Sequence, residues 1–291
     1  MRIYVHTDME GMAGLGDGRL IADRGSADFR RCAEIFWREV DAVARGLFAG
    51  GATEVAVLDS HGVGHLDPAK LDLRLSFASN KEQIWWGSLD ASWDATCFVG
   101  AHAMSGTQGG FLEHTQSGQD WYRYFVNGRE TGELGQWAAV AGEFGVPMIL
   151  VTGDEAACAE ARDFFDPIVA VATKRGLSRM RAECLPLEEA HRRVAEGARA
   201  AMELVGRARP FLIPKPSTIR WEFCRCSMAD DAEGLPGVRR VGPREVEKVV
   251  DHAGYSILPG LLRCQAYPGE TERSGVKVIG PAGKLPAGTG F

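Results

Sequence analysis

Hydrophobic and polar positions in the first part of the chain follow the period of a strand, then that of a helix, then that of a strand again. Residues Arg2–Asp8 alternate like a strand, and Ala27–Phe48 carries apolar side chains at helical spacing until two glycines end the pattern. Thr53–Asp59 is rich in β-branched residues and predicts a second strand. This order is typical of a crossover unit, so we expect the two strands to pair in parallel.

Strands and helices continue to alternate as far as residue 173. The further strands that we expect are Ala95–Ala101, Trp121–Val126, Met148–Thr152 and Ile168–Thr173. A helix is expected over Glu133–Phe144, and Asp154 is placed to cap the alanine-rich helix that follows it. The predicted fold class is therefore α/β, with a mostly parallel sheet that is flanked by helices.

Beyond Lys174, strands and helices no longer alternate as crossover units. An amphipathic helix is expected over Leu187–Val205, a strand over Thr218–Cys224 and a helix near Pro243–Leu262. This mixture predicts a second, smaller α+β domain. The limits that we expect are 1–165 for the α/β domain, 166–268 for the α+β domain and 269–291 for an irregular C-terminal tail.

Composition and charge favour an ordinary globular protein that acts on small molecules. The 291 residues include 39 acidic and 33 basic side chains, so the chain offers no predominantly positive surface for nucleic-acid phosphates. Its apolar runs are too short to span a bilayer, and its N-terminus does not resemble a signal peptide, so we expect no membrane association. The same two features lead us to expect a cytoplasmic protein, and seven scattered cysteines, an odd number, are expected to be reduced and buried.

Polar residues follow the predicted strands of the first half at their carboxyl ends. Asp8 and Glu10 follow the first strand, His61 follows the second and His102 follows the third, while Glu133 stands at the start of a helix. The carboxyl ends of parallel strands are where α/β folds collect ligands. We therefore expect these five side chains to converge on one crevice.

A cluster of this composition predicts a metal site. Carboxylates that are held close together repel one another unless a cation lies among them. Carboxylate oxygen and imidazole nitrogen together suit zinc or a similar divalent ion. Five ligands are too many for one catalytic zinc ion, whereas a pair of ions about 3.5–4 Å apart accommodates them. From residue types alone, the hypothesis is a two-metal hydrolase.

Each of these residues also has a plain structural interpretation. Asp8 could cap a turn, Glu133 could favour a helix N-terminus, and a lone histidine such as His61 or His102 is more often a packing residue than a ligand. Their shared position at strand ends favours the metal interpretation. The histidines without such a position, which we expect to be structural or surface residues, are His6, His65, His191 and His252.

The glycine-rich segment 11–18 is a rival motif. It follows the first strand, as the phosphate-binding loop of a dinucleotide site does. However, Arg19 occupies the position of the third glycine, and the preceding Asp8 and Glu10 would repel a pyrophosphate. Nucleotide binding is therefore disfavoured.

Several short motifs that are far apart in the chain occur together in this sequence. They are Asp8-x-Glu10-Gly11, Asp59-Ser60-His61, Gly100-Ala101-His102-Ala103, His114 and Gly132-Glu133-Leu134-Gly135. In this combination the sequence resembles the D-aminopeptidase family of dipeptide-operon proteins, peptidase family M55. The resemblance extends from Met1 to about Leu262 and includes Ile219–Phe223, which is similar to the second domain of the family.

The resemblance implies a specific activity and assembly. It implies two bound zinc ions, and the release of an unprotected N-terminal D-amino acid, such as D-Ala, from short peptides and amides. The metal ligands that it implies are Asp8, Glu10, His61, His102 and Glu133. Asp8 would bridge the two ions, and His114, in the glycine-rich loop after the third strand, would be the catalytic histidine. It also implies a homo-oligomer, a decameric ring with active sites that face an inner channel.

Two other functions stay open at this point. One is a dinuclear metal amidohydrolase that has the same ligands but acts on another amide substrate. The other is a non-catalytic peptide-binding protein that retains the fold. Divalent ions other than zinc would also suit a site of mixed oxygen and nitrogen ligands.

Overall fold

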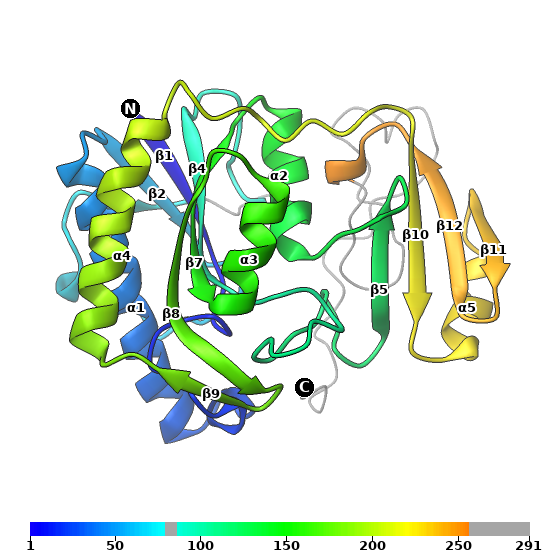
Figure 1. Ribbon diagram of the computed structural model, residues 1–291, viewed down its shortest axis with the longest axis horizontal. Helices are drawn as coiled ribbons and strands as arrows, with labels where there is room; N and C mark the ends of the chain where they lie inside the picture. The colour runs from blue at the N-terminus through cyan, green and yellow to red at the C-terminus, as the bar shows by residue number, and fades with distance from the viewer. Residues whose placement is uncertain (79–85, 256–291) are drawn as a thin grey trace.

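The computed structural model of the chain describes residues 1–78 and 86–255, and its strands within these residues form two sheets (Figure 1). The strands of the first sheet are β1 (Arg2–Thr7), β2 (Glu54–Leu58), β3 (Leu75–Phe77), β4 (Ala95–Ala101), β7 (Met148–Asp154), β8 (Val169–Ser178) and β9 (Arg181–Cys184). Those of the second sheet are β5 (Trp121–Val126), β6 (Arg129–Glu130), β10 (Ser217–Phe223), β11 (Val238–Gly242) and β12 (Glu245–Val250). The tail expected over 269–291 lies outside the described residues.

The first sheet is parallel except for β9, which pairs with β8 in the antiparallel sense. Its strand order is β3-β2-β1-β4-β7-β8-β9. From β1 the chain moves outward to β2 and β3, then returns to the other side of β1 with β4 and moves outward again to β7 and β8. The direction reverses between β1 and β4, and ligands of open α/β sheets bind at the carboxyl ends beside such a reversal.

Helices cover both faces of this sheet. They are α1 (Ala27–Ala49), α2 (Glu133–Glu143), α3 (Glu155–Phe164) and α4 (Leu187–Ala201). On one face, Phe36 of α1 and Val194 of α4 share a buried cluster with Val5 of β1. On the other face, Trp137 of α2 packs with Tyr4 of β1. The expected mostly parallel sheet flanked by helices is confirmed. In the described part of the chain, no helix combines the length and apolar character needed to cross a lipid bilayer.

Asp154 joins the end of β7 to the start of α3. One oxygen of its carboxylate accepts a hydrogen bond from the N–H of Ala157 at 2.7 Å, which satisfies a backbone donor that the helix leaves free. The other oxygen accepts one from the N–H of Phe111 at 2.8 Å. The capping role expected of Asp154 is therefore confirmed, and the same carboxylate also holds the loop that follows β4.

The second sheet is antiparallel and has its own core. Its strand order is β11-β12-β10-β5-β6. Side chains along β10 alternate between buried and half-buried positions, and Ile219, Trp221 and Phe223 face the core. There they pack with Ala229 and Ala232 of α5 (Cys226–Glu233). The strand expected over Thr218–Cys224 is thus present and lies at the centre of this sheet.

The helix expected near Pro243–Leu262 is wrong within the described residues, because most of the segment up to Val250 forms strand β12. Val246 and Val250, an even number of residues apart, lie on the buried face of this strand, whereas Val249 lies on the other face and is exposed. Glutamate and lysine in this segment favour a helix locally, but pairing of β12 with β10 and β11 outweighs that preference.

The two sheets do not divide the chain at residue 166. Strands β8 and β9 and helix α4 follow this point in sequence but belong to the first sheet and its cover, whereas β5 and β6 precede it but belong to the second sheet. The amphipathic helix that we expected in the second domain packs on α1 instead, with Val194 and Ala198 buried. The domain limits 1–165 and 166–268 stay a prediction.

Candidate metal centre

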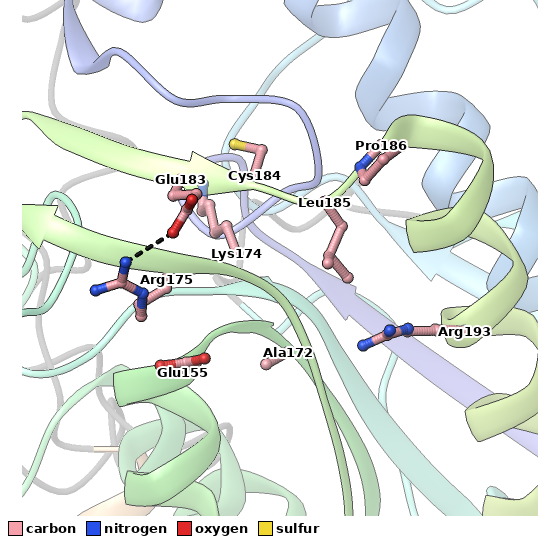
Figure 2. Close-up of a pocket in the computed structure, with 9 residues that line it drawn as sticks. All are labelled: Glu155, Ala172, Lys174, Arg175, Glu183, Cys184, Leu185, Pro186 and Arg193. Atoms are coloured by element: carbon pink, nitrogen blue, oxygen red, sulfur yellow. Dashed lines mark hydrogen bonds and ion pairs between the residues drawn. The ribbon is translucent and has the colours of Figure 1, made fainter.

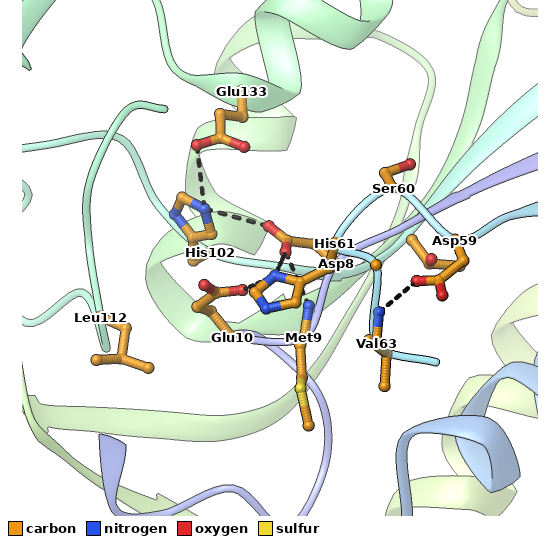
Figure 3. A network of polar contacts seen from close by, with 12 residues as sticks. Asp8, Met9, Glu10, Asp59, Ser60, His61, Val63, His102, Leu112 and Glu133 are labelled. Atoms are coloured by element: carbon orange, nitrogen blue, oxygen red, sulfur yellow. Dashed lines mark hydrogen bonds and ion pairs between the residues drawn. The ribbon is translucent and has the colours of Figure 1, made fainter. Parts of the chain in front are cut away.

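The carboxyl ends of three neighbouring strands bring the predicted site residues together (Figure 3). Asp8 follows β1, and the loops after β2 and β4, which flank β1, carry His61 and His102. Glu133, the first residue of α2, points at His102 from the far side of the cluster. The reversal of strand order between β1 and β4 therefore places side chains that are distant in sequence around one point.

Asp8, Glu10 and His61 form one compact group. The Nδ1 atom of His61 lies 3.0 Å from Oδ1 of Asp8 and 3.1 Å from Oε2 of Glu10. One possible ligand atom from each residue lies within 4.8 Å of the other two. Both carboxylates are buried, so they have little water to stabilise their charge.

His102, His114 and Glu133 form a second group beside the first. Oε1 of Glu133 lies 3.5 Å from Nε2 of His102 and 3.6 Å from Nε2 of His114. The two imidazole rings stack with centroids 4.0 Å apart. Nε2 of His102 also lies 3.2 Å from Oδ2 of Asp8. Asp8 therefore contacts both groups, with one carboxylate oxygen toward each.

Backbone carbonyl groups orient both histidines of the second group. Nδ1 of His102 donates to the carbonyl oxygen of Ala103 at 3.0 Å, and Nδ1 of His114 donates to that of Leu112 at 2.8 Å. When either ring is neutral, its proton therefore lies on Nδ1, and Nε2 has a lone pair directed toward the cluster. This is the tautomer that a ligand or a general base requires.

The cluster contains buried polar atoms that need a partner. Oδ2 of Asp8, Oε2 of Glu10, Nε2 of His61 and Nε2 of His102 make no well-directed hydrogen bond within the described residues, although both oxygens lie close to an imidazole nitrogen. Such atoms cost free energy unless something binds them. Carboxylate oxygens and imidazole nitrogens are donors that zinc accepts. The residues present thus fit a site for divalent metal ions.

The electrostatics of the cluster lead to the same conclusion. Burial by itself lowers the pKa of His61, but the carboxylates of Glu10 and Asp8 outweigh it and raise the pKa to about 10. Burial also opposes charge on His102, whose pKa Glu133 and Asp8 raise well above its usual value. The cluster therefore attracts positive charge strongly, either as protons on imidazole or as a metal cation.

Two glycines allow the loops that carry the ligands to approach closely. A Cβ atom on Gly11 would lie 1.9 Å from the carbonyl oxygen of Ala101, and one on Gly100 would lie 2.0 Å from that of Asp8. Gly100 also has a φ of 77°, in the left-handed region that favours glycine. The glycines in the motifs around Asp8 and His102 are thus explained by backbone packing between β1 and β4.

Sequence reasoning missed several residues that support the cluster. The N–H of Gln116, a residue with a φ of 62°, donates to Oε1 of Glu133 at 2.7 Å. Glu39 of α1 is buried and accepts a hydrogen bond from the N–H of Ala13 at 2.6 Å. Glu39 could have been noticed, because it lies three residues after Phe36 on the apolar face of the predicted helix. No local pattern marks Gln116.

His6, which we expected to be structural, lies next to the cluster. Its Nδ1 atom is 2.7 Å from the hydroxyl oxygen of Ser60, and its ring stacks on Trp137 at 4.1 Å. Burial lowers the pKa of His6 to about 4, so its ring is neutral near pH 7. It therefore packs beneath the loop of His61 without adding charge.

The fold and the cluster define the class: an α/β protein with a candidate centre for divalent metal ions at the strand-order reversal. A family model for D-aminopeptidase, peptidase family M55, matches residues 1–255. The chain belongs to this family, which confirms the resemblance carried by the motifs.

A sequence match and a structure match, both to Bacillus subtilis D-aminopeptidase, agree with this assignment. The chain is 30% identical over 240 residues to a D-aminopeptidase of strain 168, in a match that covers 81% of this chain and 86% of the relative. It is similar in structure to the Zn-dependent D-aminopeptidase DppA, a self-compartmentalizing protease, with a TM-score of 0.82 and 28% identity. That match covers 87% of this chain and 93% of the DppA chain.

Replacing His61 by alanine tests whether the first group binds metal. We expect His61→Ala to weaken zinc binding more than ~100-fold, because it removes a side chain that would bind the metal directly. Loss of a residue that only contacts a ligand typically costs ~10–100-fold. Zinc content after dialysis against buffered zinc measures this effect. His65→Ala removes an exposed histidine of the same loop and is the matched control. Zinc binding at the control level in His61→Ala would contradict the assignment.

Proposed function

We propose that the chain is a two-zinc aminopeptidase that hydrolyses the N-terminal peptide or amide bond of short peptides, with a preference for an N-terminal D-amino acid such as D-Ala. The observation that carries the proposal is the pair of donor groups that meet at Asp8. Membership of the D-aminopeptidase family supports the reaction class, and the zinc dependence of DppA supports the metal.

The proposed metal ligands divide between the two groups. Glu10 and His61 would hold one ion, His102 and Glu133 the other, and Asp8 would bridge the two. The contacts that support bridging are those of the two Asp8 oxygens, with Oδ1 near His61 and Oδ2 near His102. When bound, the zinc ions lower the pKa of a water molecule toward neutrality and polarise the scissile carbonyl group.

His114 is the proposed catalytic residue. Its Nδ1 is occupied by the carbonyl oxygen of Leu112, so Nε2 is the atom that can accept a proton and return it. Its side chain is 12% exposed against 1% for His102, so a substrate can reach His114 more readily. His114 would hold the proton at Nε2 and pass it to the departing amine, which prevents the amine from re-forming the bond. Oε1 of Glu133 lies 3.6 Å from this Nε2 atom.

The stereochemical preference can be tested with matched amides. We expect release of ammonia from D-alaninamide to exceed that from L-alaninamide by at least about tenfold in kcat/KM, or about 1.4 kcal/mol of transition-state discrimination. N-acetyl-D-alaninamide, which has no free amine, is the control and should not react. Equal rates for the two enantiomers would contradict the preference. Reaction of the acetylated control would show that the enzyme does not require a free amine, and it would favour another amidohydrolase activity.

The role of His114 can be separated from metal binding. We expect His114→Ala to lower kcat by ~10²–10⁴-fold, the usual contribution of a general acid or base, while bound zinc is largely retained. Turnover of a D-alanyl peptide and zinc content are measured on the same preparation. Full activity would exclude a catalytic role. Loss of zinc would instead make His114 a ligand, which its place beside His102 and Glu133 also permits.

We extend the proposal to assembly and location. The family resemblance implies a homo-oligomer in the form of a decameric ring, and the self-compartmentalizing character of DppA supports an oligomer. Mass photometry should then give particles of ten chains, and a monomer at micromolar concentration would contradict the ring. A cytoplasmic location is supported by the six cysteines within the described residues, all of which are free thiols.

A further inference from the structure

A lysine is buried beneath the loop that carries two of the proposed metal ligands. Lys174 of β8 is 3% exposed, although lysine is almost never fully buried without partners. Its ammonium group donates hydrogen bonds to the carbonyl oxygens of Glu10 at 2.5 Å and Leu15 at 3.0 Å. It also lies 4.2 Å from the ring centroid of Phe111. Lys174 thus connects the first sheet to both ends of the segment 10–15.

Other buried side chains hold the middle of the same segment. Glu39 accepts hydrogen bonds from the N–H of Ala13 at 2.6 Å and from the hydroxyl group of Thr152 at 2.9 Å. The hydroxyl group of Thr173 faces the carbonyl oxygen of Gly11 at 3.4 Å. These contacts hold the backbone of Gly11 and Ala13, which are not proposed ligands. Lys174 instead holds the backbone of Glu10, which is a proposed ligand.

Neighbouring groups partly offset the cost of burying the charge of Lys174. Burial lowers the pKa of Lys174 to about 8, whereas Cys184, Asp154, Glu39 and Glu10 favour its charged form. A buried cation among carboxylates is stable only if its hydrogen bonds are satisfied as well, and the two carbonyl groups satisfy them here. The loop, the lysine and the surrounding carboxylates therefore form one interdependent unit.

We propose that Lys174 is a positioning residue that directs the carboxylate of Glu10 toward the metal. The carbonyl group and the side chain of Glu10 share one Cα atom, so fixing the carbonyl group fixes the direction in which the side chain leaves the loop. Glu10 belongs to the group with Asp8 and His61, and none of the hydrogen bonds from Lys174 goes to the group of His102, His114 and Glu133. Lys174 therefore acts on one of the two zinc sites. This inference rests on the proposed zinc function.

The surroundings of Lys174 allow a specific substitution and a matched control. Lys174 lines a cavity of about 290 Å³ together with Arg175 and Cys184 (Figure 2), so a methionine of similar length has room there. Arg175, the next residue of β8, lines the same cavity but pairs with exposed Glu183 at 2.7 Å. Arg175→Met thus removes a cation from the same strand without touching the loop.

The test compares zinc binding by wild type, Lys174→Met and Arg175→Met in titrations at buffered free zinc. We expect Lys174→Met to bind one of its two zinc ions ~10–100-fold more weakly, as is typical when an outer-shell partner is lost, and the other with unchanged affinity. Arg175→Met should bind both ions like wild type. Wild-type binding of both ions by Lys174→Met, or equal weakening of both, would overturn the proposal.

A double variant separates positioning from folding. Removal of Lys174 alone takes away a cation that offsets the buried charge of Glu39, which destabilises the fold. In the variant Lys174→Met/Glu39→Gln this charge is absent, and the amide can still bond with the N–H of Ala13. We expect the double variant to have an unfolding temperature closer to that of wild type than Lys174→Met has. It should still bind one of its two zinc ions more weakly than wild type does. Recovery of both affinities together with stability would overturn the proposal. Zinc binding and D-alaninamide turnover by wild type test the proposed function separately.

Discussion

Repulsion among buried carboxylates is the constraint on which this structure depends. Asp8 and Glu10 are buried beside His61, half-buried Glu133 shares His102 with Asp8, and protonated imidazole or a bound cation offsets their charge. Without such partners the arrangement would be a large cost in stability. The fold tolerates it because the parallel sheet holds the three loops at fixed positions, with Gly11 and Gly100 allowing the backbones to approach.

The need to hold these carboxylates in place also explains why buried charged residues surround the cluster. Lys174 and Glu39 are buried, which is unusual for charged residues, and each forms hydrogen bonds with the backbone of residues 10–15. A metal-binding loop that is held only by its ligands would rearrange when the metal leaves. A loop that is also held from beneath is preorganised, so less free energy is spent on ordering it when metal binds.

Much of the fold could be predicted from the sequence because its elements are long and regular. The strands over Ala95–Ala101 and Trp121–Val126 were predicted at their observed bounds. The helix expected near Pro243–Leu262 was wrong within the described residues, because the helical preference of a short, charged segment was outweighed by pairing with a distant strand. Sheet membership of β5 and packing of α4 on α1 are likewise set by contacts between segments that are far apart in sequence.

The candidate site could be predicted for a related reason. Asp8, His61 and His102 each follow a strand, and parallel strands present their carboxyl ends at one edge, so local patterns sufficed to bring the residues together. The support from Lys174 could not be predicted, because its partners are backbone carbonyl groups that carry no residue-type signal. The sequence therefore indicates which side chains can bind metal, but it does not indicate which side chains bond to the backbone.

Anomalous X-ray scattering at the zinc absorption edge, from crystals grown with zinc, locates bound zinc ions directly. We expect two peaks per chain about 3.5–4 Å apart, one on either side of the Asp8 carboxylate. A single peak, or zinc found only away from these side chains, would contradict this expectation.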